Sequence, residues 1–124
     1  MTMTTGPNLG LVINGTAGEE HYASLMRMWR GLDGLTMPRV VTRSLSYPPA
    51  NPANGGMYII AEFSSGPWAA RTGQIARYFT TGEGGPGWEF FPPKAGWSVM
   101  VLDELDIKGS PIEYRYTASG WGRT

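Results

Sequence analysis

Residues 57–80 read MYIIAEFSSGPWAARTGQIARYFT and contain two apolar runs separated by a turn-forming stretch. The runs at 57–63 and 74–80 are rich in the β-branched and aromatic residues that strands favour. Between them, Ser64-Ser65-Gly66-Pro67 is typical of a turn. This stretch therefore predicts two neighbouring strands and a β-class domain.

Further short strands are expected on both sides of this stretch, each bounded by Gly, Pro or Asn. They cover residues 40–46, 88–91, 97–102, 112–117 and 120–121. The segment GEGGPG at 82–87 is expected to be a flexible loop because of its glycines. Six or seven short strands with turns between them predict a compact β domain over residues 35–124, a small antiparallel barrel or sandwich.

A single amphipathic helix is expected before the strands, over residues 16–34. Thr16 and Glu19 have the spacing of a capping box, and Asp33-Gly34 after Leu32 is typical of a helix stop. Apolar side chains recur at helical spacing on one face of this helix. They are Tyr22, Leu25, Trp29 and Leu32.

Residues 1–15 are rich in Thr, Gly and Asn and predict an extended N-terminal arm. Such an arm gains order by packing on another surface. Its apolar patch consists of Leu9, Leu11, Val12 and Ile13.

The apolar stripe of the helix has two interpretations, which the sequence leaves open. The stripe packs on the β domain of its own chain, or it packs against other copies of the chain. It spans little more than two heptads, which is too short for an autonomous coiled coil. Packing between copies would therefore need contacts between the β domains as well.

Composition excludes several classes of function. The 124 residues include ten Lys and Arg against ten Asp and Glu, so a basic surface for nucleic acid is absent. No cysteine is present, which excludes thiolate metal sites and cysteine nucleophiles. No apolar run approaches the roughly 18 residues of a membrane span, and the N-terminus lacks the pattern of a signal peptide. We expect a soluble domain made inside a cell, with no membrane insertion.

No catalytic or metal site is expected from the remaining polar residues. Carboxylates that could serve a glycoside hydrolase lack a recognisable catalytic context and are interpreted as solvated surface groups. They are Glu62, Glu83, Glu89, Asp103, Glu104 and Asp106. His21 lies in the first helical turn and is interpreted as a polar rim residue. No cofactor is expected.

Tryptophans allow two interpretations. Aromatic rings stack on pyranose sugars, but they also dominate small β cores by area. Trp88 and Trp97 are expected in the core. Trp68 and Trp121 occur in Gly/Pro contexts and are the candidate glycan contacts.

Several motifs occur in a fixed order along the chain. They include PNLG at 7–10, LDG at 32–34, GGMYII at 55–60 and WEFFPPKAGW at 88–97. This set, over residues 7–121, resembles an uncharacterised domain family of bacteriophages, prophages and gene transfer agents. That family occurs in tail-fibre-like proteins and in head spikes or fibres. It usually has Gly-Asp-Arg before its tyrosine strand, where this chain has Gly56-Met57, and it tends to continue into larger fibre proteins.

The resemblance implies a non-enzymatic virion structural protein, made in the host bacterial cytoplasm. It would be a trimeric fibre, spike or decoration component of head or tail, with its own copies and other virion proteins as partners. The arm and helix would attach it through Leu9, Leu11, Val12, Ile13, Tyr22, Leu25, Trp29 and Leu32. The alternative is a carbohydrate-binding adhesin module that recognises host surface polysaccharide through Trp68 and Trp121.

Overall fold

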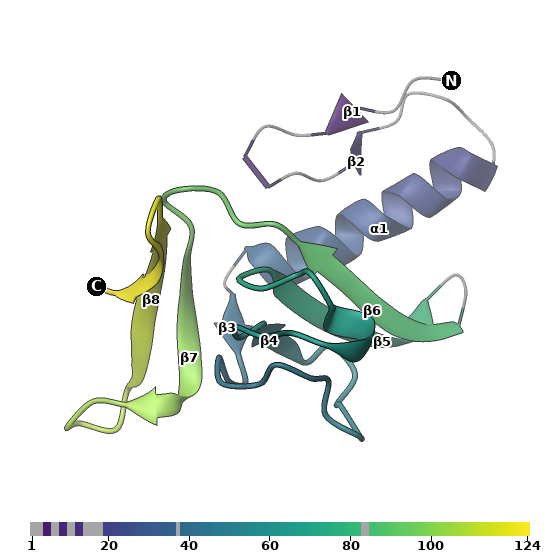
Figure 1. The fold of residues 1–124 in the computed structure, drawn as a ribbon. Coiled ribbons are helices and arrows are strands. Elements are labelled where there is room, and N and C mark those ends of the chain that lie inside the picture. The colour runs from purple at the N-terminus through teal and green to yellow at the C-terminus, as the bar shows by residue number, and fades with distance from the viewer. Residues whose placement is uncertain (1–3, 6–7, 10–11, 14–18, 37, 83–84) are drawn as a thin grey trace. The chain divides into compact units, whose positions relative to one another are not determined.

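The computed structural model describes residues 4–5, 8–9, 12–13, 19–36, 38–82 and 85–124. The chain divides into two compact units, residues 1–37 and residues 38–124. The first unit contains the helix and the second contains the two main sheets (Figure 1).

The arm forms a short strand pair in the described part of the first unit. Strands β1 (Thr4–Thr5) and β2 (Val12–Ile13) pair antiparallel, with Thr4 opposite Ile13. The arm thus satisfies part of its backbone by folding on itself, where the sequence predicts only an extended segment. The proposed capping residue Thr16 lies outside the described residues.

Helix α1 (Glu19–Leu35) continues through Asp33 and Gly34, so the predicted stop at these residues is wrong. A glycine inside a helix costs about 1 kcal/mol relative to alanine, which tertiary context can offset. Gly34 is buried, and the Thr36 amide still donates to the Leu32 carbonyl at 3.0 Å, beyond the glycine. The hydrogen-bond ladder, rather than the local Asp-Gly signal, decides where the helix ends.

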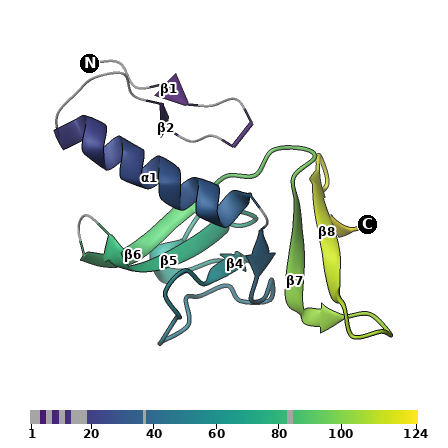
Figure 2. The ribbon, with the colours of Figure 1, turned by 180° about the vertical axis from the view of Figure 1, so that it is seen from behind.

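Seven strands in the described part of the second unit form two sheets (Figure 2). The three-stranded sheet has the order β4-β5-β6 and the four-stranded sheet the order β3-β7-β8-β9. The strands are β3 (Arg39–Val40), β4 (Met57–Ile59), β5 (Ile75–Gly82), β6 (Gly85–Phe91), β7 (Ser98–Leu105), β8 (Pro111–Thr117) and β9 (Gly120–Arg123). The prediction of a mainly β domain with one helix is confirmed. The sheets do not close into a barrel.

The segment after Pro38 joins the two sheets, and this arrangement differs from the predicted strand over 40–46. Arg39 and Val40 pair parallel with Met100 and Val101 of β7. The chain then crosses to the other sheet, where Val41 N donates to Met57 O at 2.7 Å. One extended segment therefore borders both sheets in turn. The four-stranded sheet is therefore mixed, because its β3–β7 pair is parallel, whereas all other strand pairs in the two sheets are antiparallel.

The β5–β6 hairpin is longer than expected. Gly82 pairs with Gly85 after a register shift that begins at Phe79. Strand pairing thus reaches into the segment predicted to be a flexible loop. Glycines lower the propensity for a strand but do not prevent backbone pairing at the end of a hairpin.

Aromatic side chains fill the core of the three-stranded sheet. Tyr58, Ala76 and Phe90 lie opposite one another across β4, β5 and β6. Ala76 is fully buried, and Trp68 packs in the same cluster. Trp68 comes from the short 3₁₀ helix η1 (Gly66–Trp68). The small side chain at the centre of the register leaves room for the large rings around it.

Valines and one tyrosine fill the buried face of the four-stranded sheet. Val40 and Val101, which lie opposite each other, are both fully buried. Val99 and Tyr114 form the next buried pair across β7 and β8. Residues between them on β7 point to the other face, as strand alternation requires.

Candidate functional site

Apolar side chains on α1 remain exposed along the predicted stripe. Trp29 is 55% exposed and Leu32 is 42% exposed, whereas Leu25 is half-buried. Gly31 and Gly34 each follow an exposed stripe residue by two positions, and both are buried. Residues two apart on a helix do not share a face. The stripe is therefore not the buried side of this helix.

The other predicted interface residues are described only in part. Leu9 is half-buried. Leu11 lies outside the described residues. The side chains of Val12, Ile13 and Tyr22 also lie outside them, although their backbone belongs to β2 and α1.

Trp68 lies in the core, and its prediction as a glycan contact is wrong. Its side chain is 0% exposed, and its ring centroid lies 5.1 Å from that of Trp88 in an edge-to-face arrangement. A second ring, that of Tyr58, lies 5.8 Å away. Gly66, with a φ of +62°, and Pro67 begin η1, which carries Trp68 inward. A buried ring has no free face for a sugar.

Trp88 follows its predicted core assignment, because it packs against the buried cluster and lies 5.1 Å from the ring of Tyr78. Trp121 is half-buried, with its ring 5.2 Å from that of Tyr116. Its indole Nε1 donates to the carbonyl of Gly73 at 2.7 Å. Trp121 thus fastens the last strand to the segment that precedes β5. Its role as a glycan contact stays a prediction.

Two further aromatic side chains, which sequence reasoning missed, are exposed. Phe63 is 91% exposed and Tyr47 is 59% exposed. The amides of Ala61 and Ser65 donate to the carbonyls of residues 45 and 46, so Phe63 lies in a short loop held at both ends. Its φ of +61° is unusual for a residue with a side chain. The only sequence signal was its position directly before the Ser-Ser-Gly-Pro turn.

The Tyr47 ring covers Gly66 in the same region. A Cβ added at Gly66 would lie 2.6 Å from Cε2 of Tyr47. Tyr47 and the loop that follows Phe63 are thus in direct contact. The name aromatic surface is given to these two exposed side chains, Tyr47 and Phe63, with the loop 61–67 that carries Phe63 and is touched by the Tyr47 ring at Gly66.

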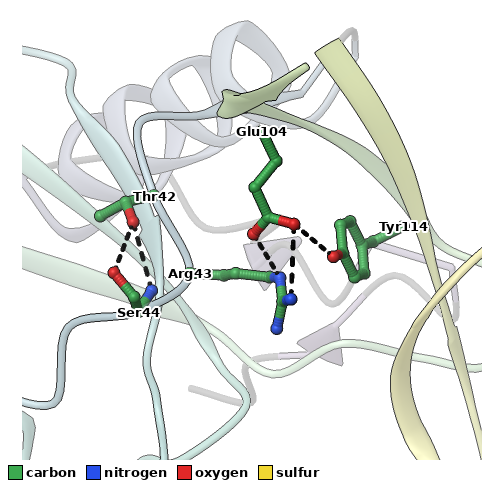
Figure 3. A network of polar contacts seen from close by, with 5 residues as sticks. All are labelled: Thr42, Arg43, Ser44, Glu104 and Tyr114. Carbon is green, nitrogen blue, oxygen red and sulfur yellow. Dashed lines mark hydrogen bonds and ion pairs between the residues drawn. The ribbon is translucent and has the colours of Figure 1, made fainter. Parts of the chain in front are cut away.

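Glu104 on β7 is the centre of a polar network (Figure 3). Its carboxylate forms an ion pair with Arg43 at 2.7 Å from Nε and accepts a hydrogen bond of 2.5 Å from the Tyr114 hydroxyl. The guanidinium carbon of Arg43 also lies 4.4 Å from the centre of the Tyr114 ring. These contacts hold the segment after β3 against β7 and β8.

Electrostatics assign Glu104 a structural role. The hydrogen bond from Tyr114 and the charge of Arg43 lower the pKa of the Glu104 carboxyl. Burial and the bond to Glu104 raise the pKa of the Tyr114 hydroxyl. At neutral pH the carboxylate is ionised and the phenol protonated, so Glu104 has no proton to donate as a general acid.

Other polar groups in the described residues serve turns. Asp106 Oδ1 accepts from the amides of Lys108 and Ser110 at 2.8 and 3.0 Å, as the side chain of a turn aspartate commonly does. Within the described part of the chain, no group of three or more His, Asp or Glu could hold a metal ion. The side chain of His21 lies outside that part. Among the described helices, none is long and apolar enough to cross a membrane.

Fold and surfaces define a small, mainly β domain preceded by one amphipathic helix. The family model described as "Protein of unknown function (DUF2793)" matches residues 28–121, so the chain belongs to this family. The match begins within α1 and ends in β9, and leaves out the N-terminal arm. None of the curated proteins matches the chain. The family description assigns no function, so the link to phage fibres stays a prediction.

Proposed function

We propose that this chain is a non-enzymatic structural subunit of a phage-type particle, a fibre, spike or decoration component of head or tail, and that it works as a trimer. Two observations support the proposal. Motifs over residues 7–121 resemble a domain found in tail-fibre-like proteins and head spikes, and the stripe on α1 is exposed in the single chain.

The exposed stripe carries the proposal. Exposing a large tryptophan on a helix is unfavourable in water, because burying an aromatic side chain removes about 150–250 Å² of surface from solvent. Trp29 and Leu32 lie on one helix face, three residues apart. Packing three copies of this face together covers these side chains. The N-terminal arm then contacts another protein of the particle.

Light scattering on a size-exclusion column tests the trimer. The unmodified chain is expected at three times its mass of 13.5 kDa over a wide range of loading concentrations. Trp29→Asp is expected to lower the mass to one chain, because a charge replaces the centre of the stripe. Phe63→Asp is the matched control, since it replaces another exposed aromatic residue and is expected to keep the trimer.

A second candidate function is carbohydrate recognition, favoured by the aromatic surface of Tyr47 and Phe63. Both rings are exposed, and Ser64, which follows Phe63 in the chain, carries a hydroxyl that lies 3.1 Å from Thr72 Oγ1. Rings among hydroxyl groups offer a sugar both an apolar face and hydrogen-bond partners. Host surface polysaccharide is the ligand class expected for an attachment protein.

An array of bacterial surface glycans, followed by calorimetric titration of any glycan that binds, tests this candidate. Tyr47→Ala and Phe63→Ala are expected to abolish binding. Trp121→Ala tests the prediction from the sequence that Trp121 contacts the glycan. Failure of every glycan to bind the unmodified protein would reject carbohydrate recognition and leave the structural role standing.

A further inference from the structure

The outer face of the four-stranded sheet carries exposed apolar side chains. On β7, Val99 and Val101 are 2% and 0% exposed, whereas Met100 and Leu102 are 40% and 36% exposed. Successive residues of a strand point to opposite faces. Beside them, on the segment that continues β3, Val41 is 43% exposed. These three side chains, Val41, Met100 and Leu102, are named the β7 patch.

A trimer held by α1 alone would bury too little surface. Stable interfaces bury about 800 Å² on each partner. The exposed parts of Trp29 and Leu32 together supply only on the order of 200 Å². A second contact between copies is therefore needed. The described residues include nine exposed large apolar side chains, and four of them lie on β7 and its turn: Met100, Leu102, Leu105 and Ile107.

Two residues of opposite charge lie on either side of the β7 patch, both opposite Met100. Register places Arg39 of β3 on one side of Met100 and Glu113 of β8 on the other. Figure 1 shows β3 and β8 on the two sides of β7. Arg39 is exposed and forms no ion pair with any other described residue. Glu113 accepts one hydrogen bond, from Thr124 Oγ1 at 3.1 Å, and keeps further acceptor sites.

We propose that the β7 patch is the contact between the β domains of the trimer, with Arg39 of each copy paired to Glu113 of the next. The inference rests on the trimer proposed above. Around a threefold axis, one flank of each copy faces the opposite flank of its neighbour. A patch with a cation on one flank and an anion on the other is therefore complementary to a second copy of itself.

Dilution of the trimer, followed by light scattering, tests the contact. Met100→Ser with Leu102→Ser is expected to raise the midpoint concentration of dissociation at least tenfold. Both side chains are partly exposed, so the melting temperature of the dissociated chain should change little. Phe63→Ser is the matched control, because it removes an exposed apolar side chain from the loop after β4, away from the β7 patch, and should leave the midpoint within twofold.

A charge exchange tests the pairing itself. Arg39→Glu and Glu113→Arg are each expected to raise the midpoint several-fold, and the double variant, with both charges exchanged, is expected to restore it. A double variant no better than the worse single variant would overturn the ion pair. If the unmodified chain is a trimer and Met100→Ser with Leu102→Ser does not change its dissociation midpoint, the β7 patch is not the contact, although the trimer itself stands. A chain that is monomeric throughout would overturn the proposed trimer and this contact together.

Discussion

The two sheets of the second unit use their apolar side chains differently. The three-stranded sheet places its large rings inside, where Trp68, Tyr58 and Ala76 are all buried. The four-stranded sheet buries three valines and the ring of Tyr114, and leaves Met100 and Leu102 exposed on its other face. The three-stranded sheet thus buries its apolar side chains in its own core. The four-stranded sheet has apolar surface left over, which fits contact with a partner.

Removal of the Trp68 ring should have the largest effect on stability, because this ring lies at the centre of the core beside the three-stranded sheet. Trp68→Ala is expected to lower the free energy of unfolding by about 3–5 kcal/mol, because it leaves a large cavity among packed aromatic rings. Chemical denaturation monitored by circular dichroism measures the change. Phe63→Ala, on an exposed residue five positions earlier, should change the same quantity by no more than about 0.5 kcal/mol. Similar costs for both would show that Trp68 is not the centre of the core.

Neighbouring residues on β7 sharpen the contrast between the two faces of the four-stranded sheet. Val101→Ala is expected to destabilise the fold by about 2 kcal/mol through lost burial and a cavity. Met100→Ala should change the stability of the dissociated chain by no more than about 0.5 kcal/mol. Denaturation at concentrations below the dissociation midpoint compares the two. Equal losses would contradict the assignment of Met100 to an outer face.

The aromatic surface beside η1 offers a smaller test. Gly66→Ala is expected to cost about 1–2 kcal/mol, because a side chain is disfavoured at a φ of +62°. The contact with Tyr47 adds to this cost. In a Tyr47→Ala background the contact is gone and the backbone cost should remain, so the penalty should fall without vanishing. If Gly66→Ala costs the same with and without the Tyr47 ring, the ring moves aside at no cost and the contact does not contribute.

Phe63 has a positive φ like that of Gly66, and its ring is exposed. Phe63→Gly is expected to be more stable than Phe63→Ala by about 1 kcal/mol, since glycine adopts a positive φ without strain. Thermal melting of the two variants measures the difference. Alanine as stable as glycine would contradict the left-handed backbone at this position.

Acid should weaken the four-stranded sheet slightly through Glu104. Its pKa is lowered in the folded state, mainly by the hydrogen bond from Tyr114, so its contribution is complete above the unfolded value of about 4.3. The contribution is lost as pH falls through the lower folded value. Glu104→Gln should therefore show a smaller loss of stability between roughly pH 5 and pH 3 than the unmodified chain. Parallel pH curves would contradict this role.

Strand patterns predicted most of the β elements because their alternation and turn residues are local features. The two-residue β3 and its parallel pairing could not be predicted, since they depend on contact with Met100 some sixty residues later in the chain. Trp68 shows the same limit: Gly-Pro-Trp is typical of a surface turn, and its ring is buried by contact with Tyr58 of β4 and Trp88 of β6. Of the candidate interface, the α1 stripe could be predicted from spacing. The β7 patch could not, because residues 97–102 alone do not show which face meets the core.

Sedimentation equilibrium of the unmodified chain at several concentrations tests the central claim most directly. The account predicts a mass of three chains of 13.5 kDa at all concentrations above the dissociation midpoint, and a mass of one chain for Trp29→Asp at the same concentrations. A mass of one chain at every concentration, with Trp29→Asp unchanged in mass, would contradict it.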